Sequence, residues 1–78
     1  MYVYILRSLT VLDQRYIGLT NDLKRRLAEH NSGKNFHTQR YLPWKLALAV
    51  WFEDSNKAAR FERYLKSGSG LAFRMRHF

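Results

Sequence analysis

Apolar residues concentrate in three short runs that predict β-strands. Residues 2–7 and 15–19 are rich in aromatic and β-branched side chains, and the polar stretch between them is typical of a turn. They predict a β-hairpin with a fairly long loop. The apolar run at residues 44–52 predicts a third strand, buried at the centre of the sheet. Residues 33–43 before it are polar and basic without a clear period, which is typical of a surface loop.

Two further segments have the period of amphipathic helices. In the first, Leu23 and Leu27 stand four residues apart, Thr20 or Asn21 can cap the start, and an Asn-Ser-Gly stretch follows. These features predict a helix over about 22–31.

The second helical segment starts after Asp54 or Ser55, either of which can cap it, and extends to about Lys66. Its predicted apolar stripe consists of Ala58, Phe61 and Leu65. A last short helix is expected over roughly 70–77.

The order of these elements, β-β-α-β-α-(α), predicts an α+β fold with a small three-stranded, mainly antiparallel sheet flanked by helices. A chain of 78 residues has room for one core, so residues 1–78 are expected to form a single domain. The chain has no cysteine, which excludes disulfides and thiolate metal sites. The first apolar run is too short for a secretory signal and contains Arg7, and no later run approaches a membrane span. We therefore expect a cytoplasmic protein without a membrane partner.

Positive charge dominates the composition. The chain carries 14 Lys and Arg against 6 Asp and Glu, a formal net charge of +8. Such a field around so small a body attracts polyanions, which makes nucleic acid the leading class of partner. The alternative is that the charge only keeps a small protein soluble. Composition does not separate DNA from RNA, and it identifies no protein partner.

Charged residues occur where the helical period predicts apolar ones. The residues Leu23, Arg26, Leu27 and His30 stand at i, i+3, i+4 and i+7, which places them on one helix face. Arg26 could be an ordinary snorkelling side chain, with its stem over apolar surface and its guanidinium in water. Alternatively, Arg26 and His30 line a polar site that the fold holds in place.

The second helix contains a comparable exception. Glu62 stands four residues after Ala58 and three before Leu65, so it flanks the apolar stripe. The ordinary explanation is a salt bridge with Arg63, Lys66 or Arg26, because partly buried carboxylates usually have such partners.

The hairpin strands carry Tyr4 and Tyr16, whose default role is to fill the core. Gly18 follows Tyr16 by two residues, and a glycine weakens a strand unless a close approach to its backbone is required. The sequence therefore indicates that some group lies close to the backbone at Gly18.

Together these residues resemble the GIY-YIG nuclease family. The stretches YVY and YIG, whose matching tyrosines Tyr4 and Tyr16 stand twelve residues apart, resemble its two-part signature. The likeness covers nearly the whole chain and includes the stretches PWKL and LKSGSG, typical of small stand-alone bacterial members; the excision-repair nuclease subunit carries a similar N-terminal domain. The catalytic positions that match are Tyr4, Tyr16, Arg26, His30 and Glu62.

The resemblance implies a metal-dependent endonuclease that hydrolyses phosphodiester bonds in DNA with structure selectivity or weak sequence specificity. DNA repair or recombination is the process it implies. It implies that Glu62 holds one Mg²⁺ or Mn²⁺ ion, that Tyr4 or Tyr16 is the general base, and that Arg26 stabilises charge on the phosphate. Because an unperturbed tyrosine has a pKa of about 10, Arg26, His30 and the metal would have to favour the phenolate. His30 could instead relay the proton.

Other basic residues would contact phosphates without reading bases. The expected nucleic-acid contacts are Lys24, Arg25, Lys34, Arg40, Arg63 and Lys66. Phe36 and Tyr41 in the long loop either stack on bases or pack the loop down, and packing is favoured. Two other functions stay open, a catalytically silent nucleic-acid-binding module and a protein-interaction adaptor. Glu62 favours the enzyme, because an acid beside a basic site repels phosphate unless a metal intervenes.

Overall fold

Three antiparallel strands form the sheet of this protein, whose computed structural model describes residues 1–68 and 70. The sheet order is β2-β1-β3, which confirms the predicted antiparallel α+β architecture. The strands are β1 (Tyr2–Ser8), β2 (Arg15–Thr20) and β3 (Trp44–Trp51).

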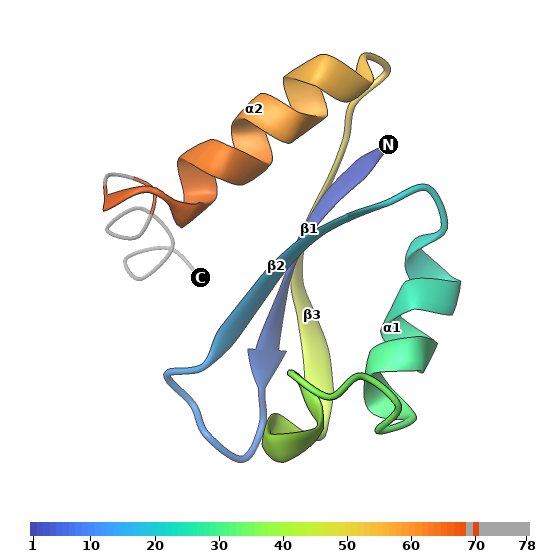
Figure 1. Ribbon diagram of the computed structural model, residues 1–78, viewed down its shortest axis with the longest axis vertical. Helices are drawn as coiled ribbons and strands as arrows, with labels where there is room; N and C mark the ends of the chain where they lie inside the picture. The colour runs from blue at the N-terminus through green and yellow to red at the C-terminus, as the bar shows by residue number, and fades with distance from the viewer. Residues whose placement is uncertain (69, 71–78) are drawn as a thin grey trace.

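Helices lie on both sides of this sheet (Figure 1). They are α1 (Leu23–Asn31) and α2 (Ser55–Lys66), and the loop before β3 contains a short 3-10 turn, η1 (Gln39–Tyr41). The order of the elements is the predicted one. The helix expected over 70–77 lies outside the described residues, except for residue 70.

The central strand is β1, so the prediction that the third strand occupies the centre is wrong. Tyr4 of β1 stands opposite Gly18 of β2 on one side and Ala49 of β3 on the other. The four residues from Val3 to Leu6 are at most 1% exposed, whereas Trp44 is the buried residue of β3. Leu46 of β3 packs against the core on one face of the sheet, and Ala47 and Leu48 pack against the core on the other, so this edge strand carries apolar side chains on both faces.

Alternate residues of β1 divide the interior into two small cores. Val3 and Ile5 face α2, and Tyr4 and Leu6 face α1, as the period of two in a strand requires. The core on the α2 side also contains Ile17, Ala58 and Leu65, and the core on the α1 side contains Trp44 with Leu23 and Leu27 packed against it. The stripes predicted for both helices are therefore confirmed.

Aspartates cap both helices. Asp22, rather than Thr20 or Asn21, caps α1, because its carboxylate accepts a hydrogen bond from the Arg25 amide at 3.1 Å. The Thr20 hydroxyl accepts a hydrogen bond from the Asp22 amide instead, at 3.1 Å, and so fixes the turn before the helix. Asp54 caps α2 as predicted, through the Asn56 amide at 2.8 Å.

Candidate active site

Four of the predicted site residues converge on the α1 side of the sheet. Tyr4 comes from β1, Tyr16 from β2, and Arg26 and His30 from the inward face of α1. The ring of His30 lies 4.5 Å from that of Tyr16 and 6.1 Å from that of Tyr4, measured between centroids. The two tyrosine rings are 6.2 Å apart. Three elements thus hold these four side chains in one cluster.

A chain of hydrogen bonds runs through this cluster. The Nε of Arg26 donates to the Tyr4 hydroxyl at 3.3 Å, and that hydroxyl lies 3.1 Å from Nε2 of His30. The Nδ1 of His30 lies 3.1 Å from the hydroxyl of Thr38. A neutral imidazole has one donor and one acceptor nitrogen. Because the buried Tyr4 oxygen already accepts from Arg26, we assign the Tyr4 hydroxyl as donor to Nε2 and Nδ1–H as donor to Thr38. Tyr4, His30 and Thr38 are at most 1% exposed, so solvent does not compete for these bonds.

Arg26 is not an ordinary snorkelling side chain. Its Nε points inward to Tyr4, while its NH1 group pairs with Glu29 at 2.9 Å, and about a third of the side chain stays exposed. The hydrogen bond to Tyr4 raises the pKa of Arg26, and hydrogen bonds to Glu29 and Tyr16 act in the same direction against its partial burial. One guanidinium therefore interacts with both tyrosine hydroxyls.

Burial sets the protonation of the two most enclosed groups. Desolvation raises the pKa of Tyr4 and outweighs the opposing hydrogen bond from Arg26. Desolvation also lowers the pKa of His30, and the positive charge of Arg26 lowers it further. Both groups are therefore held neutral near pH 7. A general base at this position would need the phenolate form of Tyr4, whereas the raised pKa favours the neutral phenol.

The glycine of the second signature stretch makes room for the first tyrosine. Gly18 stands directly opposite Tyr4, and a β-carbon at Gly18 would lie 2.5 Å from the Tyr4 oxygen and 2.6 Å from its Cζ. These separations are well inside van der Waals contact. The close approach that the sequence predicted at Gly18 is thus the approach of Tyr4 itself.

Thr38 is a site residue that the sequence did not indicate. It lies in the loop before β3, and its backbone carbonyl accepts a hydrogen bond from the Trp44 indole at 2.9 Å. This bond anchors the loop so that the Thr38 hydroxyl meets His30. A threonine in a polar loop follows no period, so it carries no signal before the loop is placed.

Glu62 lies on the other helix, which packs on the opposite face of the sheet from Tyr4. Its carboxylate pairs with Lys66 at 2.7 Å, so the predicted salt bridge is confirmed with Lys66 as its partner. Within residues 1–68 and 70, no three His, Asp or Glu side chains gather in a group that could hold a metal ion. Glu62 nevertheless supplies one hard oxygen donor that is only 16% exposed, and Mg²⁺ is often held by one carboxylate together with waters and substrate phosphate. The donor set therefore fits a single weakly held ion.

The basic residues predicted to contact nucleic acid are all on the surface. Two of them have acidic neighbours, since Arg25 lies 3.4 Å from Glu29 and Lys66 pairs with Glu62. Those with exposed side chains are Lys24, Arg25, Lys34, Arg40, Arg63 and Lys66. Over the part of the chain that the structure describes, neither α1 nor α2 has the length and apolar character needed to span a bilayer.

Comparison with known proteins gives a consistent result. A family model described as the GIY-YIG catalytic domain matches residues 1–74. The chain is similar to UPF0213 proteins, with 46% identity over 52 residues to one from Lactococcus lactis subsp. cremoris and 42% over 66 residues to one from Streptococcus pneumoniae. These matches cover 65% and 83% of this chain, and 53% and 65% of the respective relatives, so the chain spans only part of their length. No solved structure matches it significantly.

Proposed function

Because the chain belongs to the GIY-YIG family, we propose that it is a metal-dependent endonuclease that hydrolyses phosphodiester bonds in DNA. The supporting observation is that Arg26 hydrogen-bonds the Tyr4 hydroxyl in a cluster where the rings of Tyr16 and His30 lie beside Tyr4. Such an arrangement offers a proton acceptor and a fixed positive charge side by side, and phosphodiester hydrolysis needs both. We further propose that cleavage depends on DNA structure more than on sequence, and that the activity serves DNA repair or recombination.

Of the two tyrosines, we assign the general base to Tyr16. The Tyr4 hydroxyl is already bonded to Arg26 and His30 and is sealed from solvent. Tyr16 is half-buried, so its hydroxyl can reach an attacking water. To act as a base Tyr16 has to be a phenolate, and the positive charge of Arg26 favours that form before the phenolate takes a proton from the attacking water. Tyr4 then acts by holding Arg26 in position.

His30 and Thr38 complete the support of this arrangement. In the assigned tautomer Nε2 of His30 accepts a hydrogen bond from the Tyr4 hydroxyl. The lone pairs of the Tyr4 oxygen are then directed toward Arg26. Thr38 accepts from Nδ1 in that tautomer and so fixes the orientation of the ring. Both are positioning residues, because neither touches the space where a phosphate would bind from solvent.

Glu62 is the residue that would hold the divalent ion. When bound, Mg²⁺ or Mn²⁺ supplies charge neutralisation at the phosphate and assistance to the departing oxygen. In the free protein Oε2 of Glu62 is paired with Lys66 at 2.7 Å, so a divalent ion would compete with Lys66 for this carboxylate. The ammonium group then becomes available to a DNA phosphate.

A cleavage panel tests the proposed function. Purified protein is incubated with single-stranded, branched and duplex DNA and RNA, with and without Mg²⁺ or Mn²⁺. Wild-type protein should cut at least one DNA substrate only when metal is present, and Tyr16→Phe should not. Tyr64→Phe, which removes an exposed hydroxyl from α2, is the matched control and should cut normally. Failure of the wild-type protein to cut any substrate would leave the binding module or the adaptor as the better account.

A further inference from the structure

The loop between α1 and β3 is held in a defined shape by its own hydrogen bonds. The Asn35 carbonyl accepts from the Thr38 and Gln39 amides at 3.2 and 3.0 Å, and the Asn35 side chain accepts from the His37 amide at 3.0 Å. At the end of the loop, the buried Ser8 hydroxyl donates to the Tyr41 carbonyl at 2.7 Å. The loop is therefore ordered before any ligand arrives, which lowers the entropic cost of binding.

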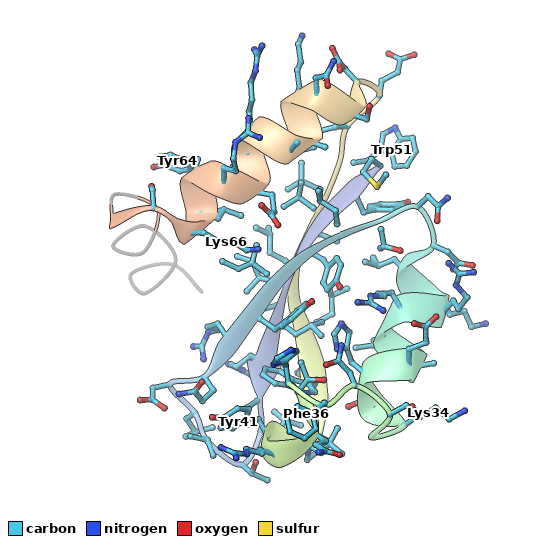
Figure 2. All side chains as sticks on the ribbon, in the orientation of Figure 1. Lys34, Phe36, Tyr41, Trp51, Tyr64 and Lys66 are labelled. Atoms are coloured by element: carbon cyan, nitrogen blue, oxygen red, sulfur yellow. The ribbon has the colours of Figure 1, made fainter. Side chains whose placement is uncertain are left out.

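This loop surrounds an open pocket of about 200 Å³ lined by Phe36, His37, Arg40 and Tyr41. Drug-sized ligands occupy pockets of about 300–1,000 Å³, so this one suits a smaller planar group. Figure 2 shows Phe36 and Tyr41 close together at the end of the molecule where this loop lies. Three of the four lining side chains carry a ring, and the fourth is a guanidinium.

Phe36 is the exceptional residue of the pocket. Its side chain is 74% exposed, the highest value among the large exposed hydrophobic residues of the described chain. Tyr41 packs the loop down instead, since its ring lies edge-on against the buried Trp44 at 6.1 Å. His37 meets Phe36 edge to face at 5.9 Å, which orients the Phe36 ring. The sequence favours packing for both aromatic residues, which is confirmed for Tyr41 and wrong for Phe36.

We propose that this pocket binds one unpaired nucleobase of the DNA strand held at the tyrosine cluster, with Phe36 as the stacking surface. The proposal rests on the proposed function in that it takes the bound polymer to be DNA. Every nucleobase presents a flat face that stacks on an aromatic ring, and Arg40 and Lys34 on the same loop are exposed and can contact the adjoining phosphates. Thr38 lies in the same loop and is bonded to His30, so the base pocket and the cluster are joined by a few residues of ordered backbone.

Binding measured without divalent metal separates this site from catalysis. Fluorescence anisotropy in EDTA compares a labelled oligothymidylate, an abasic strand of the same length, and a duplex. Phe36→Ala should weaken binding of the oligothymidylate roughly 5- to 150-fold, the loss expected for one base stack, and leave the abasic strand and the duplex unchanged. Phe36→Leu should lose affinity in the same way, and Phe36→Trp should retain it. Trp51→Ala, which removes an exposed aromatic side chain distant from the loop in Figure 2, is the matched control and should bind like wild type.

Several results would overturn the base pocket. They are equal affinity of Phe36→Ala and wild type for oligothymidylate, an equal loss for the abasic strand, and full affinity in Phe36→Leu. The outcome is independent of the cleavage panel. A Phe36-dependent preference for bases in a protein that cuts no substrate would refute the proposed nuclease and support the base pocket. Cleavage without that preference would support the nuclease and refute the base pocket.

Discussion

Replacing Gly18 with alanine should destabilise the protein strongly, because the new β-carbon would overlap the ring of Tyr4 at 2.5–2.6 Å. Tyr4 is fully buried, so its ring has no free space to enter. Overpacking of this kind costs about 1–3 kcal/mol. Displacing the hydroxyl from Arg26 and His30 adds about 1–3 kcal/mol for two hydrogen bonds. Alanine in a strand returns about 0.5–1 kcal/mol relative to glycine, which leaves a net loss of about 3 kcal/mol.

Urea denaturation followed by tryptophan fluorescence measures this loss, and thermal unfolding should show a decrease in Tm of roughly 12–24 °C for a domain of this size. Gly68→Ala is the matched control, because no atom of the described residues, its chain neighbours apart, lies within 4 Å of a β-carbon at Gly68. Its effect should stay within about 0.5 kcal/mol. A Gly18→Ala protein as stable as wild type would refute the reasoning.

A double-mutant cycle identifies the contact responsible. Tyr4→Leu shortens the side chain opposite Gly18, so Gly18→Ala should cost much less in that background than in the wild type. If Gly18→Ala costs the same in both backgrounds, the strain arises from some contact other than Tyr4.

Four further outcomes are expected. Glu62→Gln keeps the size of the side chain but loses its charge, so this variant should still bind DNA yet lose metal-dependent cleavage. Calorimetry of the free wild-type protein should show little Mg²⁺ binding, because one carboxylate holds the ion weakly. Tight binding of two ions would contradict the single-carboxylate site. Burial and the charge of Arg26 lower the pKa of His30 below its unfolded value of about 6.5, partly opposed by Glu29. The free energy of unfolding should therefore be highest above about pH 6.5 and decline as the pH falls through that value toward the folded pKa. His30→Gln should flatten this decline in urea titrations. Thr38→Val leaves Nδ1 of the buried His30 without its acceptor and should cost about 1–3 kcal/mol, whereas Thr38→Ser should be mild. Urea denaturation measures both, and equal stability of the two variants would argue against this hydrogen bond. DNA affinity should fall steeply with salt, as counterion release requires for a chain of net charge +8, and a flat dependence would argue against phosphate contacts.

Periodicity was sufficient to predict the elements and the two helix faces. The spacing of Arg26 and His30 placed both on the leucine face of α1, and the structure confirms that this face points inward. Periodicity does not decide strand order, because a run that is apolar on both faces suits an edge strand between two helices as well as a central strand. The run at 44–52 was therefore assigned to the centre, where β1 in fact lies.

The candidate site is predictable where residues follow a regular period, match a motif or stand out in a strand. Tyr4 and Tyr16 were identified by their motif, but the sequence did not distinguish them, because burial and hydrogen bonding separate a sealed hydroxyl from a half-buried one. Thr38 escaped prediction because its role depends on where an irregular loop is anchored. Gly18 was correctly marked as a point of close approach, but only the cross-strand register identifies Tyr4 as the approaching group.

The alternation of β1 between two layers makes the site depend on a helix that lies on the opposite face of the sheet. Val3 and Ile5 are covered by α2, and Tyr4 between them is covered from the α1 side, so one stretch of backbone carries both layers. If α2 separates from the sheet, Val3 and Ile5 become exposed to solvent. The strand that carries Tyr4 then loses the packing of one of its two faces. The amide protons of β1 should then exchange with solvent only in openings close to global unfolding. A proteolytic cut in the turn before α2 would accordingly inactivate the tyrosine cluster from across the sheet.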